Sequence, residues 1–228
     1  MLVHSWAPHD DEQHSVTDPG GAEALVAELR AQGASVDHLS ADFADPGAPA
    51  LVVARALERF GRVDVLVANH ARSGIQSLTE LTAAELDLTF AVNTRATLLL
   101  VKELAAARDP HPGGRVVLFT SGQYHGAMPS ELPYIASKGA LHQLTGSLAA
   151  ELMVRGITVN AIDPGPTDTR YPDPDRLAWV AELIPGGRWG APQDAARLVS
   201  WLVSYEGAWV TGQVIASDGG WSILRRGT

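Results

Sequence analysis

The sequence predicts one α/β domain in which helices cover a parallel sheet. Six short runs are apolar at mostly consecutive positions, a pattern typical of strands that are buried on both faces. Segments with helical periodicity separate these runs, and this alternation predicts right-handed βαβ units. The 228 residues are 46% hydrophobic, which suits a single domain, 1–228, with a buried sheet and requires no second domain.

The strands and the first two helices can be placed from this pattern. We expect strands at residues 2–5, 35–39, 63–68, 115–119, 157–162 and 213–216. Apolar stripes with helical spacing run through Ala22, Leu25, Val26 and Leu29 and through Val53, Ala56, Leu57 and Phe60. Gly33 and Gly61 follow these stripes, so each of the two helices is expected to end at its glycine.

Two later helices, at about 82–107 and 133–154, are longer than a crossover between strands needs, and Thr82 is a candidate cap for the first of them. The stretch 166–190 is rich in Pro, Asp, Gly and Trp. This composition predicts a mobile flap that contains a short helix at about 174–183. A flap over the carboxyl end of a strand is suited to closing over a substrate.

Composition narrows the possible partners. The formal charge of −9 argues against broad contact with nucleic acids or membrane surfaces, because both are anionic. The absence of cysteine excludes disulfides and thiolate chemistry. No signal peptide or long apolar span is recognisable, so a cytoplasmic location and a small-molecule substrate are expected.

The feature with the most chemical meaning is the pair Tyr134 and Lys138, four residues apart on a predicted helix. Residues at this spacing share a helix face, so the lysine ammonium can favour the ionised form of the phenol. Ser121 lies 13 positions earlier, just after the strand at 115–119. A tyrosine and a lysine at this spacing are more often a solvated pair on the surface. Here, however, Ser121, Tyr134 and Lys138 are all expected at the carboxyl edge of the sheet, where open α/β sheets bind ligands.

Further motifs occur along the chain in a definite order. They are Asp42 in Ala-Asp-Phe, Asn69 in Leu-Val-Ala-Asn-His-Ala, Asn93 in Val-Asn-Thr, Thr120-Ser121-Gly122, Tyr134 to Lys138, Asp163 to Thr169, Thr211 to Val214 and Asp218-Gly219-Gly220. From about residue 2 to about 221, this series resembles the short-chain dehydrogenase/reductase family, and it looks most similar to bacterial reductases of the 3-oxoacyl-carrier-protein type. The resemblance implies a Rossmann-like, doubly wound parallel sheet.

The resemblance also implies roles for four residues. Tyr134 would be the proton donor to a carbonyl or the acceptor from an alcohol, and Lys138 would lower the pKa of Tyr134 and contact the nicotinamide ribose. Ser121 would orient the substrate oxygen. Asn93 would bind a relay water, although an amide that satisfies backbone groups where a helix is interrupted is an equally good reading, and both can hold.

For the cofactor, the resemblance implies contacts from a set of residues that begins at the end of the strand 2–5. These are Ser5, Asp42, Asn69, Tyr134, Lys138, Pro164, Gly165, Thr167 and Thr169. His4-Ser5-Trp6 contains no carboxylate that would accept from a ribose 2′-hydroxyl or repel a 2′-phosphate. NADP(H) is therefore the expected cofactor, with NAD(H) as the alternative.

One part of the family pattern is missing from the sequence. The family opens with a strand, the loop Thr-Gly-x-x-x-Gly-x-Gly and a helix, whereas this chain is expected to begin within the second strand, at residues 2–5. The loop holds the cofactor diphosphate, and the first strand is central in the sheet, so strands 2 and 3 would lose their neighbour. A start codon placed too far downstream competes with a real loss of dinucleotide chemistry, and we favour the first.

We therefore expect an NAD(P)-dependent oxidoreductase that reduces a ketone or 3-oxoacyl group or oxidises the alcohol. The alternative is a family-like protein without catalysis or cofactor that serves as an oligomeric binding or structural subunit. By resemblance the two long helices would form the interface of a homodimer or homotetramer. Tyr124 and His125 could line the substrate pocket. No metal site is expected, because the spacing of His4, His9 and His14 in a loop fixes no ligand geometry.

Overall fold

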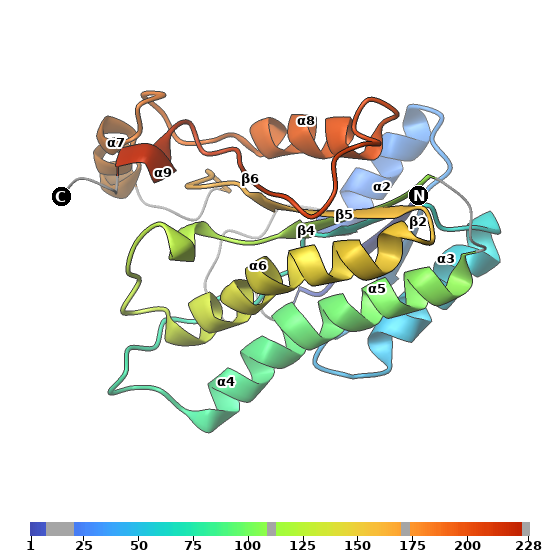
Figure 1. Ribbon diagram of the computed structural model, residues 1–228, viewed down its shortest axis with the longest axis horizontal. Helices are drawn as coiled ribbons and strands as arrows, with labels where there is room; N and C mark the ends of the chain where they lie inside the picture. Colours follow the sequence, from blue (N-terminus) through green and yellow to red (C-terminus); the bar gives the residue numbers. More distant parts are fainter. Residues whose placement is uncertain (8–20, 109–112, 170–173, 225–228) are drawn as a thin grey trace.

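The computed structural model describes residues 1–7, 21–108, 113–169 and 174–224 (Figure 1). Its strands are β1 (Leu2–Ser5), β2 (Asp37–Ser40), β3 (Val65–Ala68), β4 (Gly114–Phe119), β5 (Ile157–Asp163) and β6 (Val214–Ala216). All pairings between them are parallel. The six predicted strands are therefore present, with ends that differ from the predicted ones by at most two residues.

The strands form two separate sheets. One contains β1 and β2, and the other has the order β3-β4-β5-β6. The expectation that strands 2 and 3 of the family pattern, here β1 and β2, would lose their neighbour agrees with the structure in part. β1 and β2 pair with each other, and the two strands that face the division are β1 and β3. The fold is an α/β domain of Rossmann type with the sheet divided at one place.

Helices cover both faces. Their bounds are α2 (Gly21–Ala31), α3 (Ala48–Phe60), α4 (Ala83–Phe90), α5 (Ala96–Ala107), α6 (Leu132–Met153), α7 (Pro174–Leu183), α8 (Pro192–Val203) and α9 (Trp221–Leu224). In Figure 1, α3, α4, α5 and α6 lie on one side of the strands, and α2 and α8 lie on the other. Gly61 ends α3 in the left-handed conformation, with φ of 74°, as its position after the stripe predicts.

The long helix predicted at 82–107 is interrupted. Thr82 caps α4 by accepting a hydrogen bond from the Glu85 backbone N–H, as expected. A π-helical turn, Ala91–Arg95, then separates α4 from α5. Such bulges are frequent at functional sites, and this one contains Asn93. The helix predicted at 133–154 is α6, which is uninterrupted.

The core explains why the strand sequences are apolar at consecutive positions. Val116 and Leu118 of β4 pack with α5 and α6 in one buried cluster, whereas Val117 packs with Ile162 and Leu202 of α8 in another. All seven residues of β5 are buried. Both faces of these two strands therefore contact helices, which alternating polar residues would not permit.

The segment 166–190 contains α7 at the predicted position. Val180, Ile184 and Trp189 form a small buried cluster, against which Trp221 packs. This cluster is separate from the main core, so the segment has its own apolar anchor beside the sheet. None of the described helices is long and apolar enough to cross a membrane.

Candidate active site at the carboxyl edge of the sheet

Lys138 is buried rather than exposed, with 2% of its surface accessible. Its Nζ donates a hydrogen bond of 3.0 Å to the Phe119 carbonyl oxygen at the end of β4, and lies 5.8 Å from the centre of the Tyr134 ring. The alternative that Tyr134 and Lys138 are merely a solvated pair on the protein surface is therefore excluded. Burial lowers the pKa of Lys138 to about 8, so about nine tenths of the amine remains protonated at pH 7.

Ser121 lies two residues beyond Phe119 in extended backbone, with φ of −154°. The hydrogen bond from Lys138 to Phe119 therefore ties the first turns of α6 to the segment that carries Ser121. Pro133 stands in the first turn of α6, where its missing N–H costs no helical hydrogen bond. The site thus places a hydroxyl, a phenol and an ammonium near one strand end.

Asn93 is fully buried, and its amide is engaged on both sides. Nδ2 donates to the Arg72 carbonyl oxygen and to Ser137 Oγ, each at 2.9 Å, and Oδ1 accepts from the Arg72 backbone N–H at 2.6 Å. Ser137 Oγ in turn donates to the Tyr134 carbonyl oxygen at 2.7 Å. The reading of Asn93 as an amide that satisfies backbone groups at a helix interruption is therefore correct, and it links the π-helical turn to α6.

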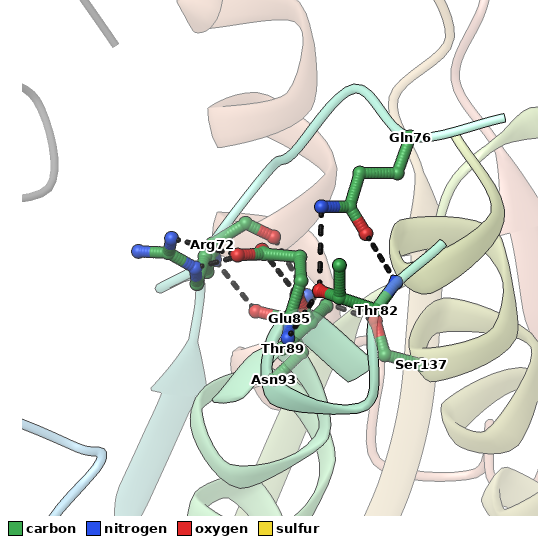
Figure 2. Close-up of polar contacts among 7 residues, drawn as sticks. All are labelled: Arg72, Gln76, Thr82, Glu85, Thr89, Asn93 and Ser137. Carbon is green, nitrogen blue, oxygen red and sulfur yellow. Dashed lines mark hydrogen bonds and ion pairs between the residues drawn. The ribbon is translucent and has the colours of Figure 1, made fainter. Parts of the chain in front are cut away.

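A polar network extends this link to the loop after β3 (Figure 2). Arg72 and Glu85 form a largely buried ion pair at 2.9 Å, and Thr89 donates to the same Glu85 carboxylate. Gln76 accepts from the backbone N–H of Thr82, the residue that caps α4. The loop, the start of α4 and the π-helical turn are thereby fixed against the helix that carries Tyr134 and Lys138.

Three of the residues expected to contact the cofactor lie away from Ser121, Tyr134 and Lys138. Ser5, Asp42 and Asn69 all line a groove of about 1080 Å³ between β1 and β3. Ser5 Oγ bonds His38 Nε2 at 2.8 Å, and Asp42 Oδ1 accepts from the Ala44 backbone N–H at 2.8 Å. The Asn69 side chain is exposed to this groove.

The loop from Pro164 to Thr169 follows β5, and Gly165 adopts a left-handed φ of 59°. A Cβ at Gly165 would lie 2.4 Å from the Asp218 Cβ, so only glycine fits against the turn after β6. Thr167 Oγ1 donates to carbonyl oxygens of this loop, at 3.2 Å from that of Pro164. The expected set of cofactor residues thus divides into the groove at β1 and β3 and the edge formed by β4, β5 and β6.

Asp163, the last residue of β5, begins the motif Asp163 to Thr169, but sequence reasoning assigned it no role in the site. Its carboxylate is buried, and Oδ2 lies 3.4 Å from His125 Nε2, within ion-pair distance but without hydrogen-bond geometry. Burial raises the pKa of Asp163. Burial and the neighbouring Asp163 raise the pKa of Tyr124 to about 12. The sequence does contain a signal for this residue, because a carboxylate at the end of an apolar strand is expected at the edge of the sheet where ligands bind.

The described residues contain no group of three or more histidines and carboxylates that could hold a metal ion. Of the histidines considered as ligands, His9 and His14 lie outside the described residues. His4 instead stacks on Phe43, with ring centres 4.0 Å apart, and its Nε2 bonds the Ala41 carbonyl oxygen at 2.8 Å.

Comparisons with known proteins find relatives that cover most of the chain. Residues 13–222 match the family model described as enoyl-(acyl carrier protein) reductase. The chain is 36% identical over 209 residues to the uncharacterized oxidoreductase YjdA of Bacillus subtilis, covering 91% of this chain and 83% of that protein. It is 32% identical to versicolorin reductase 1 of Aspergillus parasiticus over 215 residues, which cover 87% of this chain and 81% of that protein.

Comparison with solved structures also finds similar proteins that cover most of the chain. A blue fluorescent protein from a metagenomic library, in complex with NADPH, has a TM-score of 0.85 at 31% identity, covering 96% of this chain and 86% of that one. The angucycline C-6 ketoreductase LanV with bound NADP has a TM-score of 0.83 at 26% identity, covering 97% and 85%. The chain therefore belongs to the short-chain dehydrogenase/reductase family of oxidoreductases.

Proposed function

We propose that the protein reduces a ketone or 3-oxoacyl group with NADPH, or catalyses the reverse oxidation, and that Tyr134 is the general acid/base. One observation carries this proposal most directly. The Lys138 ammonium is buried beside the Tyr134 ring and held by the Phe119 carbonyl oxygen at the carboxyl edge of the sheet. Burying a cation costs stability, so its placement beside a phenol is best explained by function.

The roles follow from the chemistry of each group. Tyr134 donates its proton to the oxygen of the carbonyl as that oxygen becomes an alkoxide, and the Ser121 hydroxyl holds the same oxygen by a hydrogen bond. The positive charge of Lys138 stabilises the tyrosinate that remains. Asn93 positions α6 through the hydrogen bond that its Nδ2 donates to Ser137 Oγ.

The cofactor would bind across the two groups of residues at the carboxyl edge. Asp42 and Asn69 provide polar groups for the adenosine end, and Tyr134 and Lys138 provide them for the nicotinamide ribose, with the loop from Pro164 to Thr169 beside it. When bound, the nicotinamide would supply the hydride. NADP(H) is favoured because His4-Ser5-Trp6 at the end of β1 contains no carboxylate, and because relatives of known structure bind NADPH or NADP.

These residues fit the two ends of the cofactor better than its middle. Among the described residues, no strand followed by a glycine-rich turn and a helix fills the space between the facing edges of β1 and β3. The diphosphate would therefore lack the backbone N–H groups that favour its negative charge. We therefore expect weak NADP(H) binding by these residues alone. This observation favours the second candidate function, a cofactor-deficient subunit that binds a partner.

The segment 166–190 is proposed as the substrate-binding flap, together with Tyr124 and His125. The two long helical segments, α4 to α5 and α6, are proposed as the interface of a homodimer or homotetramer. Light scattering at micromolar concentration tests the second point, and a monomer would contradict it.

Turnover of a carbonyl panel with NADPH, followed by absorbance, tests the reaction. Tyr134→Phe keeps the ring and removes the acidic proton, so turnover should fall by about two to four orders of magnitude. Tyr205→Phe is the matched control, because Tyr205 is 89% exposed, and it should retain turnover. Wild-type turnover in Tyr134→Phe would remove this phenol from the mechanism, and absence of both turnover and NADP(H) binding in the wild type would favour the subunit.

A further inference from the structure

Three residues at the carboxyl ends of β4 and β5 carry buried polar side-chain atoms that have no hydrogen-bond partner among the described residues. They are Gln123, His125 and Asp163. A buried carboxylate oxygen without a partner is the costliest of these groups, so Asp163 Oδ2 is the atom that most needs an explanation. His125 Nε2 lies 3.4 Å from this oxygen, within ion-pair distance. The close approach makes His125 the candidate partner of Asp163.

The other oxygen of Asp163 holds the loop that follows β5. Oδ1 accepts a hydrogen bond of 3.0 Å from the backbone N–H of Gly165. Further along the same loop, the Asp168 backbone N–H donates to the Gly190 carbonyl oxygen at 2.9 Å, at the far end of the segment 166–190. Asp163 therefore stands at the base of the proposed flap, and a shift of its carboxylate would be transmitted to the loop.

A second carboxylate, Asp218, packs against Gly165 but does not need such a partner. Its Oδ1 accepts from the Gly220 backbone N–H at 2.9 Å, and its Oδ2 accepts from the Ser222 backbone N–H at 2.7 Å. Both oxygens of Asp218 are thus satisfied within its own turn. Of the two carboxylates at this corner of the described structure, Asp163 is the one with an oxygen that lacks a hydrogen bond.

His125 is tied to the segment that carries Ser121. Its backbone N–H donates to the Gly122 carbonyl oxygen at 3.0 Å, which closes the short 3₁₀ turn that follows Ser121. Its ring packs on Tyr124, with ring centres 3.8 Å apart, and Tyr124 contacts His142 of α6 at 4.4 Å. The imidazole is therefore held in place through both its backbone and its ring.

The pair of His125 and Asp163 lies close to the proposed site of the substrate oxygen. A Cβ added at Gly122, the residue after Ser121, would be 3.9 Å from Asp163 Oδ2. The two facing atoms, His125 Nε2 and Asp163 Oδ2, are both buried. A substrate cannot touch these atoms, so the pair acts through the segments that it joins.

We propose that His125 is a positioning residue, which by pairing with Asp163 holds Ser121 and the loop from Pro164 to Thr169 in the arrangement that the reaction requires. The proposal rests on the proposed function, in which Ser121 holds the substrate oxygen and the loop lies beside the nicotinamide ribose. A small displacement of either group lowers the rate without removing a reacting group. The imidazole suits this role because its N–H, or the charge of its protonated form, compensates the buried carboxylate.

Hydrogen exchange at the backbone N–H of Gly165, measured by NMR, tests the pair without any turnover. His125→Leu removes the partner of Asp163 Oδ2 and should speed this exchange at least about tenfold. His125→Gln keeps an N–H donor, and its exchange should stay within about threefold of the wild type. His142→Leu is the matched control, because it removes the second imidazole in contact with Tyr124 and leaves the pair in place. Unchanged exchange in His125→Leu, or equal acceleration in His142→Leu, would overturn the proposal.

An Asp163→Asn background shows whether the two residues act as a unit. The asparagine keeps an acceptor for the Gly165 N–H and removes the buried charge. His125→Leu should therefore speed exchange at Gly165 by less than about threefold in this background. Melting curves verify that each variant folds. An undiminished effect of His125→Leu would mean that His125 acts without Asp163, and the proposed pairing would be wrong.

Steady-state turnover of a carbonyl substrate with NADPH gives the second readout. In His125→Leu, kcat should fall at least about tenfold and KM should change less than about threefold, because Ser121 holds the oxygen most strongly as the alkoxide forms. His125→Gln should recover most of this loss, and His142→Leu should retain the wild-type kcat.

A His125→Gln protein as slow as His125→Leu would show that the packing of the ring matters rather than its N–H, and would contradict the proposal. A wild type without any turnover would contradict the proposed reaction and not the pair. The exchange at Gly165 then decides the pairing by itself, so the two failures are distinguishable.

Discussion

Lys138 Nζ donates a hydrogen bond of 3.0 Å to the Phe119 carbonyl oxygen, and this contact joins helix α6 to the end of strand β4. The ammonium is almost completely buried, and the carbonyl is the hydrogen-bond acceptor found for it. A neutral acceptor compensates only part of the cost of removing a cation from water. Lys138 should therefore oppose folding while it supports the proposed chemistry.

Lys138→Met should make this conflict measurable. The pKa of Lys138 is about 8 in the folded protein and near 10.5 in the unfolded chain, so the burial cost is fully present below pH 8 and is relieved as pH rises toward 10.5. The cost at pH 7 is about 3 kcal/mol at most. We expect Lys138→Met to raise the free energy of unfolding at pH 7, to flatten its increase between pH 8 and 10.5, and to abolish most turnover.

Urea unfolding at a series of pH values, with turnover measured in parallel, checks this prediction. Lys102→Met is the control, because the Lys102 side chain is 70% exposed on α5. A Lys138→Met protein that is less stable than the wild type at pH 7 would mean that the hydrogen bond to Phe119 outweighs the burial of the charge.

Asn93→Ala should loosen α6 from the π-helical turn. The substitution removes hydrogen bonds to both backbone groups of Arg72 and to Ser137 Oγ, and leaves buried polar atoms without partners. We expect a loss of about 2–4 kcal/mol in the free energy of unfolding and a fall in turnover. Thr82→Ala, which removes the cap of α4 and a long hydrogen bond of 3.5 Å from Gln76 Nε2, should cost about 1 kcal/mol and leave turnover nearly unchanged.

Denaturant titration and turnover measurements together distinguish the effect of Asn93→Ala from that of Thr82→Ala. Asn93→Asp is informative, since it keeps the acceptor for the Arg72 N–H and removes both donors. Equal stability of Asn93→Ala and Thr82→Ala would contradict the role assigned to the Asn93 amide.

The sequence predicted strands and most helices because those elements depend on local pattern. β4 and β5 were recognisable since consecutive apolar residues such as Val116 and Val117 contact helices on both faces. The helices α8 and α9 were not predicted, and neither was the π-helical form of the interruption at Asn93. The turn depends on contacts between Asn93 and residues far from it in the sequence, Arg72 and Ser137, which no local pattern encodes.

For the site too, the sequence predicted what depends on local spacing and not what depends on contacts between distant segments. Spacing placed Tyr134 and Lys138 on one helix face, but the acceptor for Lys138 is a backbone carbonyl 19 residues away, on a different element. The approach of His125 to Asp163 joins the segment after β4 to the end of β5 and likewise exists only after folding. The division of the sheet was expected, because a central strand of the family pattern has no counterpart in the sequence.

His70 should make the protein sensitive to acid. Burial, followed by the charge of Lys138, lowers the pKa of His70 to about 3, below its ordinary value near 6.5. Stability is therefore fully present above pH 6.5 and is lost as pH falls toward 3, by about 2 kcal/mol at pH 5. Burial also lowers the pKa of His4, whose ring lies 6.5 Å from that of His70.

His70→Asn removes the titrating ring and should flatten the loss of unfolding free energy between pH 6.5 and 4. Thr97→Val is the control, because it removes a hydroxyl 3.3 Å from His70 Nε2 but keeps the imidazole, and it should retain the wild-type slope. Chemical denaturation at several pH values measures both slopes. An unchanged slope in His70→Asn would assign the acid sensitivity to other groups.

Gly165→Ala should disrupt the loop after β5 far more than a glycine substitution usually does. Gly165 has a φ of 59°, and an added Cβ would lie 2.4 Å from Asp218 Cβ and 2.9 Å from its Cα. Backbone cannot rotate away as a flexible side chain can, so either the loop or the turn that carries Asp218 has to move. Gly33 provides the comparison, since its φ is 86° but nothing lies within 4 Å of an added Cβ.

Gly33→Ala therefore measures the conformational cost of a left-handed alanine alone, which is about 1 kcal/mol. Gly165→Ala adds the steric conflict and should lose about 3 kcal/mol or more, together with turnover if the loop contributes to the site. Thermal melts give the difference between the two variants, and turnover of the folded fraction gives the second readout. Equal destabilisation would show that the turn at Asp218 yields easily, and the fit of Gly165 against it would then have no structural importance.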